Sequence, residues 1–323
     1  MSLVFILSLP RSGSTLLQRM LCTQERIGSI AEPWVLLPIL YKPENGVAFS
    51  DYDVETCDIA VKDFYCEVNG GESRVKRDLC QVISRIYAEI ADEKGCEIFI
   101  DKTPRYTLVA EELVNYFPDA KFIVLYRNPL AVAASIIKSF SQNVWRMDHY
   151  YIDLFEGLSN LTSTVKKHSD RFIVVRYEEL VSNPAVECGR VIRQLGLQPD
   201  IEKLSNPSEV SFKGEMGDKS GVKKYTGVSV KSVDAWAEFY CNPFRKRWGR
   251  WYLKSLGPNV LTDMGYNYNE IDAKLKAQKA GVSMLGSDII RFVYGKLDLV
   301  FGIWMLRKRL VRFLTGKPVR MAK

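Results

Sequence analysis

The chain is poor in histidine, has no paired-cysteine motif and contains no long apolar run. Only two of its 323 residues are histidines, His149 and His168, so chemistry that needs a histidine has few candidates. Seven cysteines, an odd number without C-x-x-C spacing, argue against a disulfide framework and a zinc site and favour a reducing compartment. No uncharged apolar run approaches the roughly 20 residues that cross a bilayer.

The first 21 residues also lack the lysine of a Walker A loop, although they resemble one in outline. Residues 3–21 begin as an apolar strand, pass through a turn of small residues and continue as a helix. Backbone N–H groups from Ser12 to Thr15 are expected to point into the turn at the positive helix end, which suits an anionic group. In the pattern G-x-x-x-x-G-K-[ST], Ser8 replaces the first glycine and Ser14 the lysine. The sequence therefore predicts a phosphate turn of another kind, with Arg11 as its only cation.

A second strand, turn and helix follow at residues 121–135. Asn128 can cap this helix and Pro129 fits its first turn. Residues 10–17 resemble the 5'-phosphosulfate loop of sulfotransferases that use 3'-phosphoadenosine 5'-phosphosulfate (PAPS), and residues 121–135 resemble their 3'-phosphate site. The resemblance implies two sets of cofactor-binding residues: Arg11, Ser12, Gly13, Ser14 and Thr15 at the 5' end, and Arg127 and Ser135 at the 3'-phosphate.

Two further motifs lie between these segments. Residues 29–34, S-I-A-E-P-W, and residues 98–106, I-F-I-D-K-T-P-R-Y, resemble the branch that includes tyrosylprotein and many bacterial carbohydrate sulfotransferases. The resemblance implies that Glu32 is the general base and that Lys102, with Arg11, stabilises the transferring sulfuryl group. Other sulfotransferases use a histidine as base, but neither histidine of this chain follows the second strand.

Two weaker likenesses complete the resemblance, which spans residues 3 to about 240. Residues 171–180 read as a strand that ends in R-Y-E-E-L, a wording common in the family, which implies that Tyr177 lies near the nucleotide. Residues 217–227 form a glycine-lysine loop where the family often has a basic segment that closes on the 3'-phosphate. We take Lys224 as the candidate contact in that loop.

The order of the predicted elements favours an α/β fold. Strand-like segments alternate with helical patterns or long insertions, which predicts a P-loop-type parallel sheet flanked by helices, with helical insertions. Apolar residues at helical spacing between Val75 and Ile90 predict an amphipathic helix that packs in the core or lines the acceptor cleft. We assign one sulfotransferase domain to residues 1–287 and a basic amphipathic segment to residues 288–323. The predicted strands are residues 3–7, 97–100, 122–126 and 172–175.

The C-terminal segment carries the net charge of the chain. The whole sequence has 45 Lys and Arg against 38 Asp and Glu, and nine of the former and two of the latter lie within residues 288–323, so this segment accounts for all of the net charge of +7. Its aromatic and aliphatic residues alternate with basic ones. The pattern fits an interfacial helix on anionic lipid or a contact for a polyanionic acceptor, and it equally fits a helix docked on the core with a solvated basic end.

Taken together, the motifs predict an enzyme that moves the sulfuryl group of PAPS to an acceptor hydroxyl by in-line displacement, without a metal and without a nucleic-acid partner. A glycan or glycolipid is the expected acceptor. Because the phosphate turn begins at Pro10, cleavage of a signal peptide would destroy it, so we expect a cytoplasmic location, with peripheral membrane contact through the tail as an option. Two alternatives stay open: a P-loop kinase of a small metabolite, suggested by Asp101 as a Walker B carboxylate, and a non-catalytic protein that binds polyanions or membranes.

Overall fold

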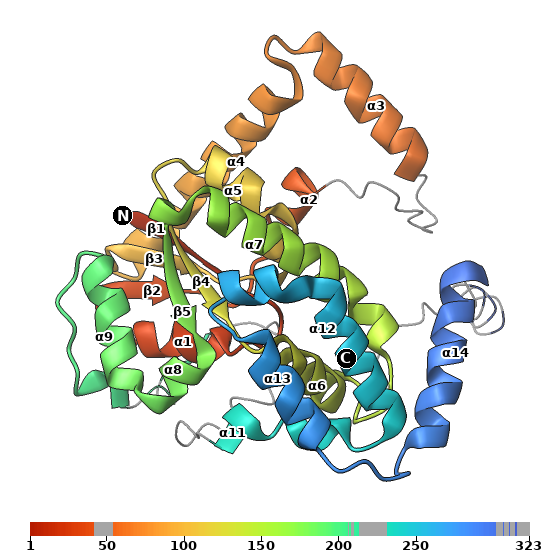
Figure 1. The fold of residues 1–323 in the computed structure, drawn as a ribbon. Helices are drawn as coiled ribbons and strands as arrows, with labels where there is room; N and C mark the ends of the chain where they lie inside the picture. The colour runs from red at the N-terminus through yellow and green to blue at the C-terminus, as the bar shows by residue number, and fades with distance from the viewer. Residues whose placement is uncertain are drawn as a thin grey trace.

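A central parallel sheet organises the protein (Figure 1). The computed structural model describes residues 1–41, 54–205, 207, 210–212, 231–301, 306, 310 and 314. Five strands lie in the order β2-β3-β1-β4-β5, and every pairing is parallel. The predicted α/β fold is confirmed, and β2 is an addition to the four predicted strands. The strands are β1 (Ser2–Leu7), β2 (Ile27–Ser29), β3 (Ile98–Asp101), β4 (Lys121–Tyr126) and β5 (Phe172–Arg176).

The sheet separates two hydrophobic cores because successive side chains of a strand point to opposite faces. In β1, Phe5 and Leu7 belong to the larger core, whereas Val4 and Ile6 belong to the smaller one. Burial on both faces explains why these strands read as continuous apolar runs.

Helices cover both faces of the sheet. The smaller core is closed by α1 (Ser14–Leu21), α8 (Tyr177–Ser182) and α9 (Pro184–Gln194). The larger core is closed by α4 (Gly71–Glu93), α5 (Ala110–Tyr116), α6 (Pro129–Phe140), α7 (Leu158–Lys167), α12 (Pro243–Asp263) and α13 (Tyr268–Ala277).

The remaining helices are short connections or lie at the periphery. They are α2 (Leu37–Leu40), α3 (Val54–Glu67), η1 (Pro104–Val109), η2 (Met147–Tyr150), the π-helix η3 (Ile152–Gly157), η4 (Ser169–Arg171), η5 (Lys203–Ser205), α11 (Lys231–Asp234), η7 (Ala237–Tyr240) and α14 (Leu285–Phe301). Figure 1 shows α3 extending away from the sheet beyond α4 at the top of the view, and α14 at the right edge.

The insertion before β3 contains the predicted amphipathic helix, α4, but the prediction of its buried face is partly wrong. Leu79, Val82 and Ile86 are exposed, and the buried positions of the helix are Lys76, Cys80, Tyr87 and Ala91. They include two residues with polar tips. Lys76 donates to the carbonyl oxygen of Leu40, and the Tyr87 hydroxyl donates to a carboxylate of β3, so hydrogen bonds rather than apolar character alone select the buried face.

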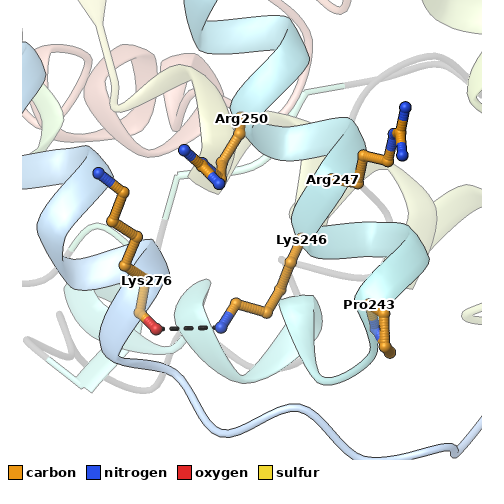
Figure 2. A pocket seen from close by; sticks show the side chains of 5 residues that line it. All are labelled: Pro243, Lys246, Arg247, Arg250 and Lys276. Carbon is orange, nitrogen blue, oxygen red and sulfur yellow. Dashed lines mark hydrogen bonds between the residues drawn. The ribbon is translucent and has the colours of Figure 1, made fainter.

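A basic hollow lies between α12 and α13 (Figure 2). Two of its cations hold the two helices together. Lys246 of α12 donates to the carbonyl oxygens of Lys276 and Gln278 at the end of α13, and Nε of Arg250 lies 3.5 Å from Oδ1 of Asp272 on α13. None of these residues belongs to the predicted site. The lining residues are Pro243, Lys246, Arg247, Arg250 and Lys276.

Candidate active site

The predicted site residues follow the carboxyl ends of all five strands. Residues 11–15 follow β1, Glu32 follows β2, Lys102 follows β3, Arg127 follows β4 and Tyr177 follows β5. Because the strands are parallel, these ends lie along one edge of the sheet, which is where open α/β sheets bind their ligands. The topology thus gathers residues that are up to 166 positions apart in the chain.

The turn after β1 presents the N-terminus of α1. Gly13 has a φ of 99°, and α1 begins at the next residue, Ser14. No side chain among the described residues caps this helix, and its first turn holds no acidic residue. Its first N–H groups are therefore suited to an anionic ligand. Three other helices differ, since α6, α12 and α13 are capped by the side chains of Asn128, Asn242 and Asn267.

Four of the predicted cofactor residues lie together beside this turn. A Cβ atom at Gly13 would come 2.5 Å from Cδ2 of Tyr177, so only glycine fits there. The guanidinium carbon of Arg127 lies 4.0 Å from the centre of the same Tyr177 ring, and its Nη1 donates to the backbone oxygen of Arg11 at 2.9 Å. Ser135 lies half-buried on α6. The remaining candidate, Lys224, lies outside the described residues.

The predicted base and stabiliser are in direct contact. Nζ of Lys102 lies 2.5 Å from Oε1 of Glu32 and 3.2 Å from Oγ1 of Thr15. The Lys102 side chain is 1% exposed and that of Glu32 is 12% exposed, so the ion pair lies almost entirely out of water. One buried cation therefore touches both the candidate base and the first turn of α1.

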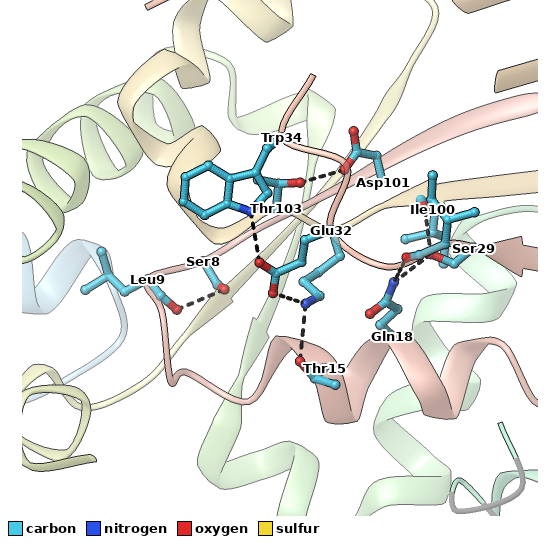
Figure 3. A network of polar contacts seen from close by, with 12 residues as sticks. Ser8, Leu9, Thr15, Gln18, Ser29, Glu32, Trp34, Ile100, Asp101 and Thr103 are labelled. Carbon is cyan, nitrogen blue, oxygen red and sulfur yellow. Dashed lines mark hydrogen bonds and ion pairs between the residues drawn. The ribbon is translucent and has the colours of Figure 1, made fainter. Parts of the chain in front are cut away.

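A hydrogen-bond network fixes the segment that carries Glu32 (Figure 3). Nε2 of Gln18 donates to Oγ of Ser29 at 2.6 Å and to the carbonyl oxygen of Ile30 at 3.0 Å. The Ser29 hydroxyl in turn donates to the carbonyl oxygen of Ile100 at 2.6 Å. These bonds join α1, β2 and β3, so the phosphate turn, the base and Lys102 are held in one frame.

Sequence reasoning missed a second partner of Glu32. The indole Nε1 of Trp34 donates to Oε2 of Glu32 at 3.2 Å, and Trp34 adopts a φ of 57°, which is rare for an aromatic residue. Arg105 stands over the Trp34 ring and makes two hydrogen bonds, of 3.0 and 3.1 Å, to the buried Asp153. Burial raises the pKa of Asp153. Trp34 and Arg105 adjoin the predicted residues within their motifs, but no local signal marks Asp153.

Asp101 does not behave as a Walker B carboxylate. It is fully buried and accepts hydrogen bonds from the Tyr87 hydroxyl at 2.7 Å and from Thr103 at 3.0 Å. Burial raises its pKa to about 6.

The two histidines contact carboxylates outside the site: Nε2 of His149 lies 3.5 Å from Asp148, and Nε2 of His168 lies 3.1 Å from Glu111.

Comparison with curated proteins finds two informative relatives. The nodulation protein NoeE of Sinorhizobium fredii (strain NBRC 101917 / NGR234) is 29% identical over 262 residues, which cover 72% of this chain and 59% of that protein. This chain therefore matches less than two thirds of the length of NoeE. A putative protein-tyrosine sulfotransferase of Caenorhabditis briggsae is 21% identical over 276 residues, which cover 82% of this chain and 89% of that protein.

A solved structure shares the fold. The sulfotransferase domain from the curacin biosynthetic pathway matches with a TM-score of 0.52 at 19% identity, over 82% of this chain and 98% of that domain. The family model described as "Sulfotransferase family" matches residues 3–201, which contain every site residue discussed above except the candidate Lys224. Since this match extends over more than half of the chain, the chain belongs to the sulfotransferase family.

Proposed function

We propose that this protein transfers the sulfuryl group of PAPS to an acceptor hydroxyl, with Glu32 as general base. The observation that carries the proposal is the buried contact of Glu32 with Lys102, and of Lys102 with Thr15 in the first turn of α1. This arrangement puts a proton acceptor, a cation and an anion-binding helix end next to one another. Membership of the sulfotransferase family supports the reaction class.

The residues present suit a nucleotide with two separate phosphate groups. The uncapped N-terminus of α1 fits a 5'-phosphosulfate, and Arg127, whose guanidinium lies against Tyr177, offers a planar set of donors for a 3'-phosphate. Ser135 and the candidate Lys224 are proposed to add contacts at the 3' end. Serine at position 14, where a Walker A loop has its lysine, argues against a Mg-ATP kinase.

In the proposed reaction, Glu32 takes the proton of the acceptor hydroxyl as the hydroxyl oxygen attacks sulfur. A new O–S bond forms while the bond between sulfur and the 5'-phosphate oxygen breaks, and the electron pair of that bond leaves with the phosphate. Lys102, Arg11 and the N–H groups of residues 12–15 stabilise the negative charge on the sulfuryl oxygens and on the leaving phosphate. As in phosphoryl transfer, catalysis then rests on positioning and electrostatics.

A carbohydrate or glycolipid is the proposed acceptor. The half-buried indole of Trp34 stands beside Glu32, and an aromatic ring at that place suits the apolar face of a sugar. The name of the nematode relative favours a second class, protein tyrosine. A screen of glycan, glycolipid and tyrosine-peptide acceptors with isotope-labelled PAPS, read by the mass gain of one sulfuryl group, separates the two.

We also propose a cytoplasmic location, which is supported by seven free cysteines, all within the described part of the chain.

Calorimetry with 3'-phosphoadenosine 5'-phosphate (PAP), ATP-Mg and AMP tests the donor assignment. PAP should bind far more tightly than either of the others, because only PAP satisfies both phosphate sites. Tighter binding of ATP-Mg would favour the kinase alternative. Tight PAP binding without sulfuryl transfer to any acceptor class would favour a non-catalytic binding protein.

A further inference from the structure

The C-terminal helix α14 has one face that is fixed to the body of the protein. Asp288, in its first turn, is completely buried and accepts from Nε and Nη2 of Arg245 at 2.7 and 2.9 Å. It also accepts from Nδ2 of Asn242, the residue that caps α12, at 2.9 Å. Because an unpaired charge would be costly there, this ion pair fixes the start of α14 against α12.

The same face continues along the helix at a spacing of three to four residues. The ring of Phe292 contacts Phe244 edge-on, with the ring centres 5.5 Å apart. At Gly295 an added Cβ would come 2.7 Å from the carboxyl carbon of Asp148, so the backbone of α14 runs close against η2. Residues 288, 292 and 295 therefore form the docked stripe, and the orientation of α14 about its own axis is set.

The opposite face of α14 is apolar and exposed. Ile290 is 69% exposed, Val293 50%, Leu297 43% and Phe301 64%, and a spacing of three to four residues places them on one stripe. A helix that merely packs on a core would carry polar side chains there. Three further apolar residues beyond this stripe, Leu306, Leu310 and Leu314, are also helical and exposed. Among the described helices, none is long and apolar enough to cross a membrane.

Charge indicates what covers this stripe. Residues 302–323, which follow α14 in the sequence, contain seven Lys and Arg and no Asp or Glu, whereas the rest of the chain, including α14, is formally neutral, so this segment carries the whole net charge of +7. A second copy would bring an equally positive segment against the first, which is unfavourable, whereas an anionic lipid surface is complementary. We propose that α14 docks the protein on the surface of an anionic bilayer, with Ile290, Val293, Leu297 and Phe301 at the boundary between head groups and acyl chains.

This docking leaves the fold intact, because the stripe that enters the lipid is not the stripe that packs on α12 and η2. The docking proposal does not depend on the proposed sulfuryl transfer. If the enzyme works at a lipid surface, however, a glycolipid becomes the acceptor class that it meets at high local concentration.

Vesicle co-sedimentation of the full chain without any nucleotide tests the proposal. The wild type should bind vesicles that contain phosphatidylglycerol, bind phosphatidylcholine vesicles weakly, and lose binding as salt rises. The double variant V293S/L297S should bind at least about tenfold more weakly, since two apolar side chains no longer enter the lipid, and should keep its melting temperature. The matched control I59S/F64S changes two equally exposed apolar residues on α3 and should bind like the wild type.

Three results would overturn the docking. The first is failure of the full-length wild type to bind anionic vesicles, and the second is binding by V293S/L297S that equals that of the wild type. The third is a wild-type dimer in analytical ultracentrifugation that V293S/L297S dissociates, without vesicle binding, which would assign the stripe to a second copy. Because neither measurement involves PAPS, failure here is distinct from failure of the proposed reaction.

Discussion

Glu32 is held between Lys102 and Trp34, so replacing it with glutamine separates its catalytic role from its structural one. Glu32→Gln keeps the shape of the side chain and one acceptor oxygen but removes the charge that faces a lysine only 1% exposed. A general base contributes about 10² to 10⁴ to the rate, so we expect turnover to fall by that factor.

The same substitution should lower stability moderately. Loss of a hydrogen bond to a charged group costs about 1.5 to 3 kcal/mol, whereas a buried charge left wholly unpaired costs about 3 to 5 kcal/mol. Glutamine still offers Lys102 an oxygen, and the position is 12% exposed, so the lower range applies. Affinity for PAP should be retained or increased, because a negative charge next to the phosphate turn has been removed.

Three measurements on one protein sample decide this prediction. Sulfuryl transfer from labelled PAPS gives turnover, calorimetry gives PAP affinity, and a thermal melt gives stability. The matched control is Glu97→Gln, because Glu97 also pairs with a cation, Arg26, but both side chains are exposed and lie outside the site. Full turnover in Glu32→Gln, in a protein shown to be folded, would refute Glu32 as the base.

Three further predictions concern other residues in or near the candidate site. Arg127→Ala should weaken PAP binding about 10- to 100-fold in calorimetry while ATP binding stays unchanged; equal loss for both nucleotides would contradict a 3'-phosphate contact. Trp34→Phe keeps a ring under Arg105 but loses the N–H that holds Glu32, so kcat should fall about tenfold with unchanged PAP affinity and melting temperature, and an unchanged kcat would remove the positioning role. Asp101 has a pKa of about 6 against an ordinary 3.8, so its stabilising effect is fully present below pH 3.8 and is lost as pH rises through 6. Denaturant titrations of the wild type and of Asp101→Asn at pH 4 and at pH 7 check this prediction. The difference in free energy of unfolding between wild type and variant should fall by up to about 3 kcal/mol from pH 4 to pH 7, and a constant difference would contradict the raised pKa.

The segments that carry the candidate site can be recognised from the amino-acid sequence alone. A turn that needs a glycine at positive φ, an apolar run buried on both faces and a capping asparagine before a proline are local requirements, so each leaves a local signal. That is why the turn at Gly13, the strand before Arg127 and the helix capped by Asn128 were correctly predicted. The positive charge of residues 288–323 is likewise a property of composition.

The contacts between these segments, by contrast, depend on the tertiary structure. Strand β2 has only three residues and forms by pairing with β3, so the sequence holds no strand pattern long enough to predict it. The fit of Tyr177 against Gly13 and the pairing of Asp153 with Arg105 join residues far apart in sequence, and such contacts arise only when the sheet brings strand ends together. The buried face of α4 was mispredicted because Lys76 and Tyr87 find hydrogen-bond partners that only the folded chain supplies. Helix α14 depends on both levels. Its sequence specifies an amphipathic helix that is followed by a basic segment, but the ion pair of Asp288 with Arg245 decides which face is buried and which is left for a partner.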